Sequence, residues 1–178
     1  MEPLIVLVAV TTLALVLGAT GPPRLHPLRR WHVALRSGLA AMFTLTGVAH
    51  FGAFGMREEL VAIVPPALPA PELLVTITGG LELAGALGII LPATAPWAAP
   101  GLSLLLLAIF PANVYKALND PTLHAIQELG PRTALQVLFL SATLAVVWHY
   151  WSTWSARRHR GTASRALPTN SLPRDAAI

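Results

Sequence analysis

The chain of 178 residues is 54% hydrophobic but only 11% charged, whereas a soluble domain usually has about a quarter of its residues charged. This composition predicts an integral membrane protein with at most five or six membrane crossings, which excludes a separate soluble catalytic domain. The sequence contains no cysteine, which excludes disulfides, thiolate metal sites and a redox CxxC pair within this polypeptide. The net charge of +4 comes from basic residues that flank hydrophobic segments, a pattern typical of membrane topology rather than of nucleic-acid binding.

Five apolar segments predict an all-α fold with five transmembrane helices. The first covers residues 3–19, and because arginines follow it instead of preceding it, we expect a retained helix and not a cleaved signal peptide. The other spans are expected at residues 31–54, 72–91, 95–112 and 132–151. The tight link PATAP joins the third span to the fourth, so these two should form an antiparallel hairpin.

The spans divide the chain into three regions. Residues 1–30 contain the N-terminal helix and a basic cytoplasmic loop, residues 31–155 form a four-helix membrane bundle, and residues 156–178 are expected to be a disordered basic cytoplasmic tail. Two long connections, residues 55–71 and 113–131, should lie on the outer side. Each contains a mixed segment, MREELVAIV or HAIQEL, that is either a short helix at the membrane interface or a loop of average length.

Glu82 is the most informative polar residue, because it lies near the middle of the third predicted span and so near the bilayer midplane. An uncompensated charge there costs about 2.5 to 3.5 kcal/mol on insertion scales. Gly80, Ala84 and Gly88 form a stripe of small residues on the side opposite Glu82, which predicts that this helix packs in the middle of the bundle. Glu82 is then either a protonated packing residue or a group that binds a ligand or handles a proton.

Further polar residues lie between the midplane and the outer surface on four helices. His50, near the outer end of the second span, should point into the bundle within reach of Glu82. Pro111 should free a backbone carbonyl near Leu107. Arg132 lies at the same depth. The predicted ligand-binding or proton-handling residues are His50, Glu82, Asn113, Tyr115, Lys116 and Gln136.

Each of these residues also has a purely structural interpretation. His50 would then be an interfacial hydrogen-bonding residue, and Lys116 would be an ordinary snorkelling residue at a helix terminus. The sequence contains no nucleotide-binding motif and no helical pair of metal ligands, so no metal site is expected.

Five motifs resemble the DoxX-like family of small bacterial membrane proteins. They are RSGLAAMFTLTGVAHF, VPPALPAPELL, TGGLELAGALGIILP, FPANVYKAL and PRTALQ, in this order over residues 36–150. The resemblance implies a four-helix bundle of the last four spans, with the first helix as an addition. The residues at the family's motif positions are Gly47, His50, Glu82, Pro111, Asn113 and Gln136. The link PATAPWAA departs from the family pattern because it has no basic residue, which weakens the expected cytoplasmic anchoring of the hairpin.

The resemblance also implies a function and a location in the bacterial inner membrane. Named relatives resemble membrane subunits of thiosulfate:quinone oxidoreductase, or partners of thiol and superoxide defence enzymes. One hypothesis is therefore a non-catalytic or quinone-interacting subunit of a redox or oxidative-stress complex. The other is a binding protein or carrier for a small apolar molecule or lipid. In neither case is the chain expected to be an enzyme on its own; its expected partners are membrane lipid and, in the first case, a redox enzyme.

The distribution of lysine and arginine predicts the orientation of the chain in the membrane. With five spans, nine basic residues fall on the side of the first loop and the tail, and three fall on the other side. The C-terminus should therefore be cytoplasmic and the N-terminus outside. Reporter fusions should show a cytoplasmic location after Arg165 and an external location at Asn119. A cytoplasmic reporter at Asn119 would contradict this topology.

Overall fold

The computed structural model describes residues 2–119 and 125–166, and within these ranges the chain forms helices and no strands. This confirms the predicted all-α fold for the described residues. The α-helices are α1 (Glu2–Thr20), α2 (Trp31–Ala49), α3 (Arg57–Ala62), α4 (Pro71–Ile90), α5 (Ala95–Asn119) and α6 (Ala125–Ala166). Two short 3-10 segments, η1 (Pro23–Arg29) and η2 (Ala53–Gly55), lie in the connections that flank α2.

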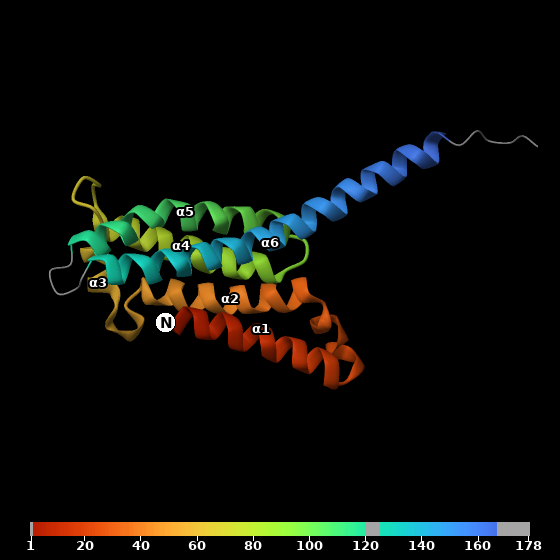
Figure 1. Cartoon of the computed structure of the whole chain (residues 1–178), viewed down its shortest axis with the longest axis horizontal. Coiled ribbons are helices and arrows are strands. Elements are labelled where there is room, and N and C mark those ends of the chain that lie inside the picture. The colour runs from red at the N-terminus through yellow and green to blue at the C-terminus, as the bar shows by residue number, and fades with distance from the viewer. Residues whose placement is uncertain (1, 120–124, 167–178) are drawn as a thin grey trace, which may run out of the picture.

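Helices α2, α4, α5 and α6 pack around a common core, and α1 lies against the outer side of α2 (Figure 1). The core is apolar and includes Leu39 and Phe43 from α2, Ile89 from α4, Leu102 from α5 and Val146 from α6, all almost completely buried. The N-terminus and α3 lie toward one end of the bundle, whereas η1 and the link between α4 and α5 lie toward the other (Figure 1).

Within the described ranges, four helices are long and apolar enough to cross a membrane: α1, α4, α5 and the segment Leu129–Ala156 of α6. These are the lengths and compositions of a multi-pass membrane protein. Helix α2 has 19 residues, as α1 does, but it contains polar residues such as His32 and Arg36 and is not among the four. Because α2 contacts α1, α4 and α6, much of its surface faces protein instead of lipid, which allows a less apolar composition.

The helix boundaries differ from the predicted spans mainly at the end of the bundle where α3 lies. Helix α2 ends at Ala49, before the predicted residue 54, and the chain then turns through left-handed conformations at Gly52, Phe54 and Gly55. The MREELVAIV segment forms the short helix α3, so the helical interpretation of it is confirmed.

The predicted long connection over residues 113–131 is wrong. Helix α5 continues through Pro111 to Asn119, and α6 begins at Ala125, so the described part of this connection is helical. Pro111 does not end α5. Its missing N–H leaves the carbonyl of Leu107, four residues earlier, without its backbone donor. The neighbouring carbonyl of Leu106 accepts a hydrogen bond from the Gln136 side chain at 2.6 Å. His124 lies outside the described residues.

Helix α6 extends into the region that was predicted to be a disordered tail. Helix α6 continues to Ala166 and projects well beyond the bundle (Figure 1), whereas disorder was expected from residue 156. The added sequence, ARRHRGTASRA, contains no proline, so nothing in it interrupts the backbone hydrogen bonds of the helix. Residues 167–178 lie outside the described part of the chain.

Two glycines bring α2 and α4 into close contact. A Cβ added to Gly79 of α4 would overlap the Cβ of His50, and a Cβ added to Gly47 of α2 would lie 2.8 Å from the Leu83 side chain and 3.3 Å from the Cβ of Glu82. Small residues of this kind permit the backbone approach that drives helix association in lipid. The α2–α4 contact therefore places His50 and Glu82 against each other.

The stripe predicted on the opposite side of α4 is only partly a packing surface. Gly80 and Ala84 are exposed, and a Cβ on Gly80 would meet no atom within 4 Å. Gly88 alone of the three contacts α5, since its Cβ would lie 2.9 Å from that of Ala98. The predicted stripe is therefore correct for Gly88 and wrong for Gly80 and Ala84. Helix α4 packs against α5 through Gly85 and Gly88.

Adjacent glycines on α4 offer a matched test of this packing. Gly79→Ala should lower the free energy of unfolding by about 1 to 3 kcal/mol, because the added methyl group has no space beside His50. Gly80→Ala should be neutral or slightly stabilising, because alanine is favoured over glycine in a helix interior. Melting temperatures in detergent would measure both variants. Equal melting temperatures would show that the α2–α4 contact is not tight at Gly79.

Candidate functional site

The site is centred on the pair formed by His50 and Glu82. Glu82 is only 3% exposed, and its Oε2 lies 3.7 Å from Nδ1 of His50, which follows the last residue of α2. The same Nδ1 lies 2.8 Å from the backbone carbonyl of Thr46. Because only a protonated nitrogen can donate to a carbonyl, Nδ1 carries a hydrogen and Nε2 is the nitrogen available to a ligand. The predicted proximity of His50 and Glu82 is confirmed.

The carboxyl of Glu82 is not fully satisfied by the protein. The side chains that interact with it are those of Thr46 and His50, both from the end of α2. Oε2 is buried and has no hydrogen-bond partner among the described residues. A buried polar atom without a partner is destabilising, and in native proteins it often marks a functional group.

A cavity of about 450 Å³ lies beside this pair. Its walls come from α2, α4, α5 and α6, and most of the lining side chains are apolar. Its polar lining residues are Thr46, His50, Thr78, Glu82, Asn113, Arg132 and Gln136. Binding sites for small molecules are typically apolar with a few polar groups that orient the ligand. The cavity therefore fits a small molecule with a mainly apolar body and one polar end.

Helix α3 and the connection after it contribute apolar side chains to the cavity at one end of the bundle. These residues are Met56, Leu60, Ile63, Val64, Pro65 and Leu68. We call residues 56–68 the roof segment. It is fixed at its start by Arg57, whose guanidinium donates to the carbonyl of His50 at 2.5 Å and to the Thr76 hydroxyl at 3.0 Å. Glu59 adds an ion pair with Lys116 of α5 at 4.0 Å.

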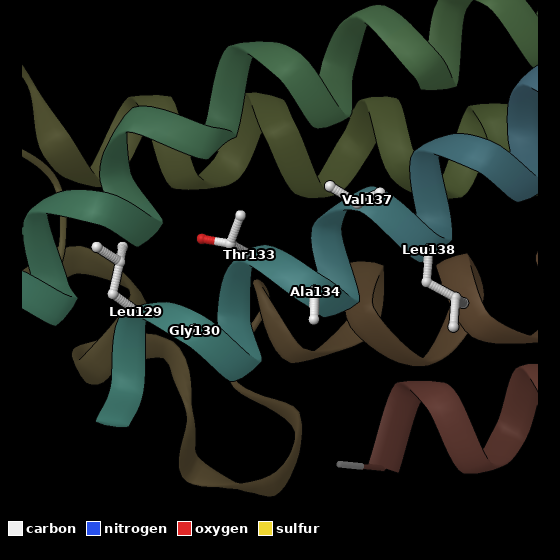
Figure 2. A pocket seen from close by; sticks show the side chains of 6 residues that line it. All are labelled: Leu129, Gly130, Thr133, Ala134, Val137 and Leu138. Atoms are coloured by element: carbon white, nitrogen blue, oxygen red, sulfur yellow. The ribbon is translucent and has the colours of Figure 1, made fainter. Parts of the chain in front are cut away.

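A second hollow, of about 700 Å³, lies on α6 (Figure 2). Figure 2 shows that all of its lining side chains project from this one helix. They are Leu129, Gly130, Thr133, Ala134, Val137 and Leu138. The Thr133 hydroxyl is the only polar side-chain group in this lining, and no lining side chain is titratable, so this surface offers no chemistry that compares with the Glu82 cavity.

Four of the six predicted site residues line the cavity, and two do not. His50, Glu82, Asn113 and Gln136 are in the lining, whereas Tyr115 and Lys116 are not. Each residue turns a helix by about 100°, so Tyr115 projects from nearly the opposite side of α5 to Asn113, and Lys116 lies almost a full turn farther along. Lys116 instead pairs with Glu59 of the roof segment.

Gln136 lines the cavity and also has a structural role. Its Nε2 donates to the carbonyl of Leu106 at 2.6 Å, and the side chain is buried. The acceptor lies one residue before Leu107, the carbonyl that Pro111 leaves without a backbone donor, so the predicted role of Pro111 stays a prediction.

Two threonines of the lining and the whole roof segment are not among the predicted site residues. Thr46 and Thr78 each lie four residues before a predicted site residue, His50 and Glu82, and so share its helix face. This spacing is the sequence signal that places them beside the site. The roof segment had no comparable signal, because nothing in its sequence states what its apolar side chains cover.

A second buried polar group, Arg36, lies at the other end of α2. The topology prediction counts Arg36 among the cytoplasmic charges, but its side chain is only 5% exposed inside the bundle. Its guanidinium donates to the carbonyls of Ile89 and Ile90, the last residues of α4, and at 2.8 Å to the hydroxyl of Tyr150 on α6. It therefore caps the carbonyl end of α4, where a positive charge is favoured.

One family model matches the chain over residues 39–153, and its description is Domain of unknown function (DUF8561). The matched range contains the His50–Glu82 pair and all of the cavity lining except Pro3. No curated protein and no solved structure matches the sequence. The resemblance to the DoxX-like family stays a prediction.

The hydrogen bonds of Arg57 predict that it controls access to the cavity. The chain has no cysteine, so Thr78→Cys would introduce a single thiol into the lining, and a small water-soluble thiol reagent would report its accessibility. Adding Arg57→Gln should increase the labelling rate several-fold, because the roof segment loses its bonds to α2 and α4. Glu58→Gln, at an exposed neighbouring position, is the control and should leave the rate unchanged. Unchanged labelling with Arg57→Gln would contradict this role.

Proposed function

Because the chain belongs to the DUF8561 family, whose description gives no function, we propose its function from the site itself. We propose that it is a membrane protein that binds a small, mainly apolar molecule through one polar end and is not an enzyme on its own. The observation that carries this proposal is that Glu82 lines an apolar cavity of about 450 Å³ and that its buried Oε2 has no partner among the described residues. A packing residue would be expected to have its polar atoms satisfied within the bundle.

A quinone is the ligand class we propose first, bound to a membrane subunit of a redox or oxidative-stress complex. A bound quinone would supply reversible transfer of two electrons and two protons. His50 and Glu82, whose side chains lie 3.7 Å apart, would bind its polar end. Either group could hold a proton, because imidazole and carboxyl groups are both titratable. The resemblance to the DoxX-like family supports the same choice.

A carrier or binding protein for a lipid or another small apolar molecule is the second candidate. The observation that favours it is the apolar roof segment, which extends the lining from the helices to the end of the bundle. Such a surface suits an alkyl chain and does not require a redox partner.

We further propose five spans in the bacterial inner membrane, with the N-terminus outside. Helix α2 runs alongside α4 within the bundle and would be the fifth span (Figure 1). The two ends of the bundle support this orientation. Arg57 and Lys116 belong to the end that carries α3, and the arginines of η1 lie at the opposite end, as the positive-inside bias predicts (Figure 1).

The decisive experiment is mass spectrometry of the small molecules that the protein retains after gentle extraction. Ala112→Phe should reduce the retained molecule several-fold, because it fills the cavity from α5. Ala84→Phe, at an exposed position of α4, is the matched control and should retain it at the wild-type level.

The identity of the retained molecule separates the two candidates. A quinone together with a stoichiometric redox enzyme supports the first, and a lipid without a protein partner supports the second. Equal retention by wild type and Ala112→Phe would overturn binding in this cavity.

A further inference from the structure

Three of the polar side chains that line the cavity direct a hydrogen-bond donor into the protein. Nδ1 of His50 donates to the carbonyl four residues earlier at 2.8 Å, and the Thr78 hydroxyl donates to the carbonyl four residues earlier at 2.9 Å. One N–H of Gln136 donates to a carbonyl of α5 at 2.6 Å. These three donors come from three different helices, and each is used by the backbone before a ligand can reach it.

Acceptors remain among the side chains that line the cavity. Oε2 of Glu82 is buried and without a partner among the described residues, and Nε2 of His50 has a lone pair when the ring is neutral. If one proton is shared between these two groups, one of them donates and the other still accepts. The Thr78 oxygen, which already donates its hydrogen, can also accept. At the His50–Glu82 end the cavity thus has more acceptors than donors.

The lining also has N–H groups on α5 and α6: those of Asn113 and Arg132, and the second N–H of Gln136. Asn113 lies on α5, and Arg132 lies near the start of α6. Arg132 already interacts with another group of the chain. These residues can meet an acceptor elsewhere on a ligand, but they do not change the hydrogen bonds that the buried Oε2 of Glu82 requires.

We infer that the cavity selects molecules whose polar end donates a hydrogen bond, such as a hydroxyl or an ammonium group, over molecules whose polar end only accepts. This inference rests on the proposed function and specifies its ligand. A ketone or ether oxygen placed against Glu82 would leave Oε2 of Glu82 unsatisfied in a buried site, whereas an O–H or N–H group would satisfy it. For a quinone ligand, the reduced hydroquinone with its two hydroxyls would bind in preference to the oxidised form.

The test compares two probes that differ only in this donor. Binding of 4-nonylphenol and of its methyl ether, 4-nonylanisole, would be measured by equilibrium binding to the protein in lipid nanodiscs, with empty nanodiscs subtracted. The phenol should bind at least about tenfold more tightly, since a hydrogen bond to a buried charged or polar acceptor has an effect of this size. Dodecylamine and decylhydroquinone, each as a competitor, would show whether an ammonium or an aromatic diol is the better donor.

Glu82→Gln assigns the selectivity to the carboxyl. Glutamine keeps the shape but adds an N–H donor, so the preference for the phenol should fall at least about threefold while the methyl ether binds no more weakly. Glu58→Gln is the control and should keep the wild-type preference. A Glu82→Gln protein that does not fold would be recognised from its melting temperature, and Thr78→Val, which removes another acceptor, would then replace it.

The outcomes separate this inference from the proposed function. Equal affinities for phenol and ether, with binding lost in Ala112→Phe, would overturn the inference and leave the proposed function standing. Binding of both probes that is unaffected by Ala112→Phe, or no binding of either, would overturn both. A preference for the phenol that persists in both Glu82→Gln and Thr78→Val would overturn the assignment to this end of the cavity.

Discussion

The rest of the structure depends on the close approach of α2 and α4 at two glycines. Gly47 of α2 faces Glu82 and its neighbour Leu83, and Gly79 of α4 faces His50. Each helix thus provides the space that the other needs for its polar residue. Apolar side chains gain little by leaving lipid for a protein interior, so close backbone contact between small residues is a main source of helix association in a membrane. The same contact that holds the bundle together also forms the site.

Two of the buried polar residues of the bundle, Arg36 and Glu82, differ in how well their polar atoms are satisfied. Arg36 is surrounded by acceptors, since it donates to the last two carbonyls of α4 and to a tyrosine hydroxyl. Its burial is therefore compensated, and it fixes the end of α4 against α2 and α6. Glu82 has one carboxyl oxygen without a partner among the described residues, beside a cavity. Burial of a polar group is not by itself evidence for a binding site. A buried polar group that lacks hydrogen-bond partners and lines a cavity is such evidence.

The cavity exists because several local features of the chain coincide at one end of the bundle. Helix α5 continues past Pro111, and the Gln136 side chain donates a hydrogen bond to a carbonyl of that helix. The chain after α2 turns sharply and then forms the roof segment. Arg57 then ties the roof segment to α2 and α4. The result is an apolar space closed partly by a short segment rather than by long helices, which suits a ligand that enters and leaves.

The sequence by itself determined the all-α fold of the described residues, the approximate limits of α1 and α4, and the similar depth of His50 and Glu82. Hydropathy and charge are properties of each segment, and depth follows from a helical rise of about 1.5 Å per residue, so none of these needs tertiary information. Only the tertiary structure decided that Arg36 is buried, that Gly80 and Ala84 are exposed, that Tyr115 and Lys116 lie outside the cavity, and that the roof segment covers it. These facts depend on how each helix is rotated about its axis. In a membrane protein both the lipid side and the protein side of a helix are apolar, so the periodicity that reveals the buried face of a soluble helix carries little information here.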